Sequence, residues 1–197
     1  MCIYSIYGYG KCKTESAIGI AIRGIANGDS VLFAQFLKDG SSSEIKFLED
    51  KVDVITSNTK KLVLPKNQTQ DDIVNINTFY KEVFNTINSK EYNLIILDEI
   101  LVAVDMGLVS IACLKLLLKT CEDKGADVYL TGRVRSRDTR NYINDLSDCV
   151  TDARCVKHMF DTYCEGCKNS FPYYYTYCPD CGSQLVESRP CRLGRDF

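Results

Sequence analysis

Four cysteines near the C-terminus form the most specific chemical pattern in the sequence. They make two Cys-x-x-Cys pairs, Cys164 with Cys167 and Cys178 with Cys181. Two such pairs supply the four ligands of a tetrahedral structural zinc site. Two disulfides or an iron site of rubredoxin type are the alternatives. Four sulfur ligands leave no open coordination position, so this metal would hold a fold and take no part in a reaction.

A glycine-containing loop near the N-terminus has the residue types that bind phosphate. It reads Gly8-Tyr9-Gly10-Lys11-Cys12-Lys13-Thr14-Glu15 and lies between a strand pattern and a helical pattern. In such a loop the backbone amides bind phosphate oxygens, the lysine adds a positive charge and the threonine hydroxyl can bind Mg²⁺. The strict motif G-x-x-x-x-G-K-[ST] is broken twice, because Tyr7 and Cys12 stand at its glycine positions. A plain turn is the alternative.

Two acidic residues, Asp98 and Glu99, follow the apolar segment 92–97. In a parallel sheet this segment would end at the same edge as the strand before the glycine loop. One carboxylate could then bind Mg²⁺ or its water, and the other could orient a group in the site. A solvated strand end is the alternative for this pair alone. Together with the loop, the pair predicts a site for a nucleoside triphosphate, with Thr14, Asp98 and Glu99 as magnesium ligands.

Strand and helix patterns alternate along the rest of the chain, and they must position these residues. Apolar segments predict strands, and longer periodic segments predict helices. The predicted strands are 2–7, 31–36, 52–55, 92–97, 126–131 and 149–156, and the predicted helices are 13–27, 43–49, 71–88, 107–123 and 137–146. This order predicts an α/β fold of the P-loop, RecA-like type, with a mostly parallel sheet and helices on both faces. Polar residues between 57 and 70 predict a long loop.

Three segments follow from this pattern. We expect a P-loop nucleotide-binding domain over residues 1–160 and a small zinc ribbon over 161–187. The polar residues 188–197 are expected to form a tail.

Composition limits the partners and the compartment. Charged residues make up 25% of the 197 residues and hydrophobic residues 45%, which is typical of a globular protein. The net charge of −2 gives no reason to expect nucleic acid or an anionic membrane as a partner. Seven further cysteines at irregular spacings argue against a disulfide framework. The N-terminal residues lack the basic segment of a signal peptide, so a cytoplasmic location is expected.

The sequence resembles the ATP:corrinoid adenosyltransferases, the family that makes adenosylcobalamin. Its glycine loop follows that family's G-x-G-K-G-K-T-T with two changes, Cys12 for a glycine and Glu15 for a threonine. Further short segments match in the same order along residues 3–161. They are 21–24, 34–38, 97–99, 130–133, 148–152 and 156–158.

The resemblance implies a reaction in which Co(I) of a corrinoid attacks the 5′ carbon of ATP and expels triphosphate. No catalytic side chain is implied, because the cobalt is the nucleophile. The resemblance implies ATP contacts at Gly8, Tyr9, Gly10, Lys11, Cys12, Lys13, Thr14, Glu15 and Arg133, and Mg²⁺ contacts at Thr14, Asp98 and Glu99. ATP, Mg²⁺, the structural Zn²⁺ and the corrinoid substrate are therefore the expected small-molecule partners. A homodimer and an electron-donor protein are left open.

The chain also departs from the family outside the glycine loop. The family carries Phe and Trp after its third strand, whereas residues 59–68 contain no aromatic side chain and the chain has no tryptophan. The zinc ribbon is no usual part of the family. Two other functions therefore stay open. One is a non-catalytic protein that binds ATP or a corrinoid, and the other is a thymidine-kinase-like phosphotransferase, which also joins a phosphate loop to a zinc-bearing segment.

Overall fold

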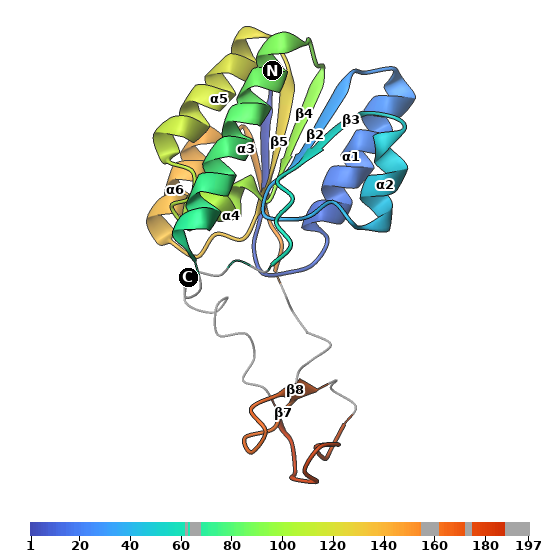
Figure 1. Ribbon diagram of the computed structural model, residues 1–197, viewed down its shortest axis with the longest axis vertical. Coiled ribbons are helices and arrows are strands. Elements are labelled where there is room, and N and C mark those ends of the chain that lie inside the picture. The colour runs from blue at the N-terminus through green and yellow to red at the C-terminus, as the bar shows by residue number, and fades with distance from the viewer. Residues whose placement is uncertain (62, 64–67, 155–161, 172–174, 188–197) are drawn as a thin grey trace. The chain divides into compact units, whose positions relative to one another are not determined.

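The computed structural model describes residues 1–61, 63, 68–154, 162–171 and 175–187 (Figure 1). The chain forms two compact units. The first comprises Met1–Gly8 and Cys12–Asp152, and the second comprises Tyr9–Lys11 and Ala153–Phe197. The segment 156–158, which carries the histidine of the resemblance, lies outside the described residues. The domain limits at 160 and 187 stay predictions.

A six-stranded sheet forms the centre of the first unit. Its order is β3-β2-β4-β5-β1-β6, and each neighbouring pair is parallel. The strands are β1 (Ile3–Tyr7), β2 (Val31–Gln35), β3 (Asp53–Thr56), β4 (Leu94–Asp98), β5 (Asp127–Gly132) and β6 (Cys149–Asp152). The predicted α/β fold with a parallel sheet is confirmed.

Helices cover both faces of this sheet (Figure 1). They are α1 (Lys13–Asn27), α2 (Ser43–Glu49), α3 (Gln70–Ser89), α4 (Ile100–Asp105), α5 (Ile111–Asp123) and α6 (Arg137–Leu146). Successive side chains of a strand point to opposite faces, so β2 and β4 contribute to two hydrophobic clusters. Phe33 and Ile96 pack with α1 and α2, whereas Leu32 and Leu97 pack with the helices of the other face.

The expected helix 107–123 begins later than predicted, at Ile111. The short helix α4 before it was not predicted as a separate element. Gly107 turns the chain between them with φ 72°, and the hydroxyl of Ser110 accepts a hydrogen bond from the backbone N–H of Cys113 at 3.1 Å. The continuous apolar residues of this region gave no sign of the separate helix α4, because both helices bury their apolar side chains in the same cluster.

The described residues of the second unit include a small antiparallel sheet. Its order is β8-β7-β9, with β7 at Thr162–Tyr163, β8 at Ser170–Phe171 and β9 at Val186–Glu187. Cys164, Cys178 and Leu185 form its own buried cluster.

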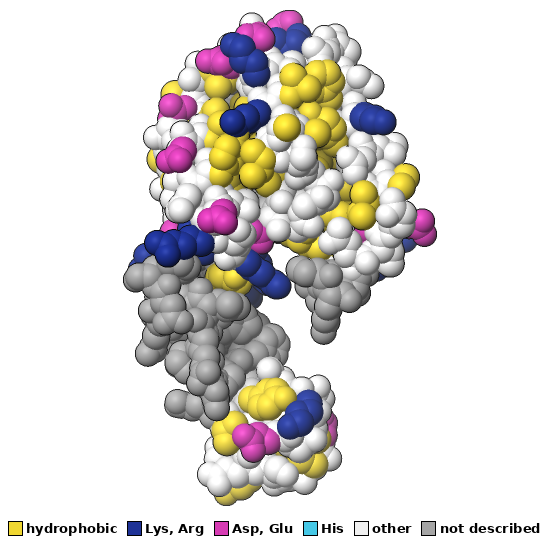
Figure 2. All heavy atoms as spheres, turned by 90° about the vertical axis from the view of Figure 1, so that its left-hand side faces the viewer, with side chains coloured by type: hydrophobic (Ala, Val, Ile, Leu, Met, Phe, Trp, Pro, Cys, Tyr) yellow, Lys and Arg dark blue, Asp and Glu magenta, His cyan; other side chains and the backbone are white. Residues whose placement is uncertain are grey.

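The outer surface of the α3 and α5 face carries apolar side chains. Figure 2 shows hydrophobic groups gathered on this face, and Val74, Ile111 and Leu116 of these helices are exposed. Nothing in the described part of the chain shows what covers them, so the homodimer stays a prediction. Within the same residues, every helix is too short or too polar to cross a membrane.

Candidate functional site

The parallel sheet brings the glycine loop and the acidic strand end together at its carboxyl edge. Strand β5 lies between β1, which leads into the loop, and β4, which ends at Asp98. The first turn of helix α1 contacts the end of β4. The Thr14 hydroxyl donates a hydrogen bond to Oδ1 of Asp98 at 3.1 Å. Ligands of open parallel sheets bind at this edge.

The carboxylate of Asp98 is fully buried and accepts hydrogen bonds from four side chains. Besides Thr14, the donors are Thr131 Oγ1 at 2.6 Å, Gln35 Nε2 at 2.9 Å and Lys38 Nζ at 2.9 Å. A carboxylate offers about four lone-pair directions, so these donors fill its acceptor capacity. Asp98 therefore organises the surrounding side chains and has little capacity left for a direct metal bond.

Lys38 contacts three of the other polar groups at this edge. Its Nζ lies 3.0 Å from Thr14 Oγ1 as well as 2.9 Å from Asp98 Oδ2, and 3.9 Å from Glu99 Oε1. Its backbone is fixed, because the Lys38 carbonyl accepts hydrogen bonds from the Ser57 hydroxyl and the Thr59 N–H. The side chain is 35% exposed.

Glu99 adopts a backbone conformation that is rare for a residue other than glycine. Its φ is 61°, and its N–H donates to Thr131 Oγ1 at 3.0 Å. Burial raises the pKa of the Glu99 carboxyl, and the neighbouring Asp98 raises it further. Strained backbones of this kind gather at functional sites, where surrounding contacts maintain them. Here the hydrogen bonds of the Thr131 hydroxyl with the Glu99 N–H and with Asp98 maintain this conformation.

The first turn of α1 carries the loop residues that the sequence predicted. Lys13 is buried, and loss of water lowers the pKa of its ammonium group, against the opposing effect of Glu99. Cys12 caps the helix with φ 78°, so the position that is glycine in the resembled family does adopt the left-handed conformation. A non-glycine residue pays about 1 kcal/mol there. Glu15 is exposed in the same turn.

The remaining predicted ATP residues fall in both units. Gly8 directly follows β1 with φ 123°, and Arg133 is exposed directly after β5. Tyr9, Gly10 and Lys11 group with the second unit. The Gly10 N–H donates to the Ala153 carbonyl at 2.7 Å, so this loop amide is bound to the chain itself. A Cβ at Gly10 would lie 2.8 Å from that carbonyl oxygen, and only glycine fits.

The oxygen atoms at this edge suit a magnesium ion. Mg²⁺ prefers oxygen ligands and keeps several waters, so it needs few from the protein. Thr14 has an oxygen lone pair, and Glu99 has a carboxylate that is 22% exposed. These two fit direct ligands, whereas Asp98 holds the Thr14 hydroxyl.

The four predicted zinc ligands lie together in the second unit. Their sulfur atoms are all within 4.8 Å of one another. Cys164 and Cys181 are 3.5 Å apart, and Cys167 and Cys178 are 3.8 Å apart. A tetrahedral site with Zn–S bonds of about 2.3 Å has sulfur atoms about 3.8 Å apart. Hydrogen bonds from Ser183 lower the pKa of Cys181 to about 6, whereas the hydrogen bond with Cys181 raises the pKa of Cys167 and burial raises the pKa of Cys178. The cluster fits a metal ion, whose identity stays a prediction.

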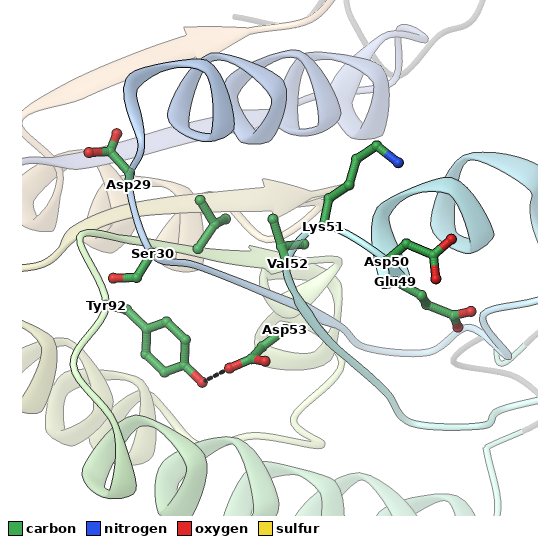
Figure 3. A pocket seen from close by; sticks show the side chains of 9 residues that line it. Asp29, Ser30, Glu49, Asp50, Lys51, Val52, Asp53 and Tyr92 are labelled. Atoms are coloured by element: carbon green, nitrogen blue, oxygen red, sulfur yellow. Dashed lines mark hydrogen bonds between the residues drawn. The ribbon is translucent and has the colours of Figure 1, made fainter.

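A hollow at the opposite edge of the sheet contains none of the predicted site residues (Figure 3). It lies where β2 and β3 begin and is lined by Asp29, Ser30, Val31, Glu49, Asp50, Lys51, Val52, Asp53 and Tyr92. Four of these side chains are acidic, so the hollow repels phosphate.

Sequence reasoning missed Gln35, Lys38 and Thr131 as members of the site. All three lie in segments that were matched to the resembled family, but no role followed from the match. The available signal was their position at or just after the carboxyl ends of β2 and β5. Side chains at such strand ends face the ligand edge of a parallel sheet.

Comparison with known proteins gives two matches. The family model described as "ATP:corrinoid adenosyltransferase BtuR/CobO/CobP" matches residues 1–169. A corrinoid adenosyltransferase from Sinorhizobium sp. is 27% identical over 158 residues, which cover 78% of this chain and 72% of the relative.

Proposed function

Because the chain belongs to the ATP:corrinoid adenosyltransferase family BtuR/CobO/CobP, we propose that it transfers the 5′-deoxyadenosyl group of ATP to Co(I) of a corrinoid and releases triphosphate. The kind of corrinoid is open. The family match supports the activity in general, and the described site supports the binding of the leaving group.

One observation carries the structural part of this proposal. The Thr14 hydroxyl, the Asp98 carboxylate and the Lys38 ammonium meet at the carboxyl edge of the sheet, next to the buried Lys13. Two ammonium groups, a helix N-terminus and a hydroxyl suited to Mg²⁺ are the groups that bind a polyphosphate. No described residue there is needed as a nucleophile.

The reaction balances without a covalent enzyme intermediate. The cobalt–carbon bond forms with an electron pair from cobalt, while the bond between the 5′ carbon and the triphosphate oxygen breaks. Triphosphate leaves with that bonding pair, and cobalt is oxidised by two electrons, formally from Co(I) to Co(III). The protein must therefore align the 5′ carbon with cobalt, exclude water and stabilise the departing charge.

Each residue at the edge has a role in that task. Lys13 binds the triphosphate directly, and Lys11 and Arg133 are further phosphate contacts. Thr14 and Glu99 hold Mg²⁺, which when bound neutralises developing charge on the leaving group. Asp98 accepts the hydrogen bond of the Thr14 hydroxyl, so the lone pairs of that oxygen, and not its hydrogen, would face a bound metal ion. We propose that Zn²⁺ in the four-cysteine cluster is structural.

The reaction is tested with reduced corrinoid and MgATP under anaerobic conditions. We expect the visible spectrum to change to that of an alkyl-cobalt product, and anion-exchange chromatography to detect inorganic triphosphate in equal amount.

Other products would identify the alternatives. ADP in place of triphosphate would favour the thymidine-kinase-like phosphotransferase. No product with authentic Co(I) corrinoid, despite ATP binding, would favour a non-catalytic binding protein.

A further inference from the structure

We infer that Lys38 competes with Mg²⁺ at the Thr14 and Glu99 oxygen atoms, and thereby makes metal binding depend on the triphosphate. The inference rests on the proposed function, because it assigns a role within the same site. Neither the family match nor the relative assigns a role to this lysine.

The geometry around Thr14 is the first argument. The Thr14 hydroxyl uses its hydrogen to bond Asp98 Oδ1 at 3.1 Å. Its oxygen accepts a hydrogen bond from Lys38 Nζ at 3.0 Å. A hydroxyl oxygen has two lone pairs, and the ammonium group takes one of them. Mg²⁺ binds oxygen at about 2.0–2.1 Å, so an ion at the other lone pair would lie only about 4 Å from this ammonium group, and the two positive charges would repel one another there.

Two of the other donors to Asp98 have no room to move away from it. Gln35 is 2% exposed and Thr131 is fully buried, so both side chains are enclosed by the fold. Lys38 has a backbone fixed by Ser57 and Thr59 and an unbranched side chain that is 35% exposed. It is the donor that can move away while the backbone stays in place.

The charges of the site indicate when Lys38 would move away from Asp98. Asp98 and Glu99 contribute two carboxylates to the cluster, and Lys13 and Lys38 contribute two ammonium groups. These charges balance, so a divalent cation alone would add uncompensated positive charge to a half-buried site. A triphosphate at the N-terminus of α1 brings negative oxygens, to which the Lys38 ammonium can turn. Metal and lysine are then both accommodated.

Two binding measurements on Lys38→Met test this competition, and neither uses corrinoid. Mn²⁺ is titrated into the protein without nucleotide and followed by electron paramagnetic resonance. ATP is titrated calorimetrically in the presence of EDTA. Loss of one charged contact corresponds to about a tenfold or larger change in affinity. We expect the variant to bind Mn²⁺ at least about tenfold more tightly than the wild type, and metal-free ATP at least about tenfold more weakly.

The opposite signs of the two shifts distinguish competition from a structural role. A lysine that only supports the fold would weaken both ligands or change neither. Equal or weaker Mn²⁺ binding by the variant would overturn the inference, as would unchanged ATP binding. Lys90→Met is the matched control, because Lys90 pairs with Asp53 at 2.6 Å outside the site and should leave both affinities unchanged.

Two further comparisons keep the test decisive. If circular dichroism finds Lys38→Met unfolded, Lys38→Gln is judged by the same two criteria. If the wild type gives no triphosphate but Lys38→Met still shows the two opposite shifts, the proposed reaction is rejected and the competition is retained. If the wild type gives triphosphate but the variant does not show the shifts, the competition is rejected and the reaction is retained.

Discussion

Lys13 combines a positive charge with burial, and this combination favours an anionic ligand. Its pKa is lowered chiefly because burial removes water from the ammonium group. An ammonium ion that is poorly solvated gains more from a phosphate than an exposed lysine would, because less hydration is lost on binding. Helix α1 adds its N-terminal amides on the same side.

Replacement of Lys13 by alanine should therefore weaken ATP binding. A charge-assisted hydrogen bond is lost, so the affinity for MgATP should fall by about ten- to a hundredfold. Isothermal titration calorimetry measures the change. Lys46→Ala, at an exposed position of α2, is the control and should bind as the wild type does. Equal affinity of wild type and Lys13→Ala would refute this placement of the triphosphate.

Cys12 carries backbone strain that a glycine would relieve. Its φ of 78° is unfavourable for any residue with a Cβ atom. Cys12→Gly should raise the free energy of unfolding by about 1 kcal/mol, measured by urea denaturation. Cys12→Ala keeps the Cβ atom and removes only the thiol, so it should give no comparable gain. A gain of the same size in both variants would show that the thiol, and not φ, is responsible.

At the scale of elements, the carboxyl end of β5 determines how the acidic residues are held. Thr131 donates to Asp98 and accepts from the backbone N–H of Glu99, so it joins β5 to the turn between β4 and α4. Gly132 follows with φ 153°, and a Cβ there would lie 2.7 Å from the backbone nitrogen of Val102. This close approach of β5 to α4 requires glycine.

Gly132→Ala should consequently disturb both stability and the site. Backbone strain together with a clash against α4 should lower the free energy of unfolding by about 2–4 kcal/mol. ATP binding should weaken as well, because Thr131 shifts. Gly125→Ala is the matched control: Gly125 has φ 71° but open space around its Cβ position, so about 1 kcal/mol is expected. Thermal and urea unfolding distinguish the two. An equal loss of unfolding free energy in Gly132→Ala and Gly125→Ala would contradict the expected clash of the added Cβ atom with α4.

At the scale of the whole molecule, the two units have separate hydrophobic clusters. The buried cluster around Cys164, Cys178 and Leu185 contains no residue of the sheet unit. Among the described residues this buried cluster is small, and metal-binding energy at a four-cysteine site is folding energy, so the cluster should depend on its metal. The sheet unit has two large clusters of its own.

Cys167→Ser should therefore unfold the metal cluster while the sheet unit keeps its stability. Elemental analysis of protein purified without added metal should find one zinc per wild-type chain and a loss of zinc in the variant. The main thermal transition should be unchanged. Cys113→Ser, in α5 and outside the cluster, should retain the zinc. Iron in the wild type would refute the zinc assignment, and a lower main transition in Cys167→Ser would refute the independence of the sheet unit.

The sequence by itself predicted all six strands and most helices of the sheet unit, and it named two groups of residues that the structure brings together. Helices α1, α2 and α6 begin and end as predicted, because periodicity and capping residues are local properties of the chain. Lys13, Thr14, Asp98 and Glu99 were predictable for a related reason: in any parallel sheet the carboxyl ends of strands share one edge. The Cys-x-x-Cys spacing likewise predicted the four-cysteine cluster without reference to tertiary contacts.

Only the tertiary structure decided how those residues are connected. Lys38 meets Thr14 across 24 positions, Thr131 meets Asp98 across 33, and Gln35 meets Asp98 across 63. These meetings depend on β4 lying between β2 and β5, and the order of strands is not a local property. The same contacts use up the lone pairs of Asp98 and place the Lys38 ammonium group against the Thr14 hydroxyl. The sequence could name the charged residues, but packing alone determined which of them face each other.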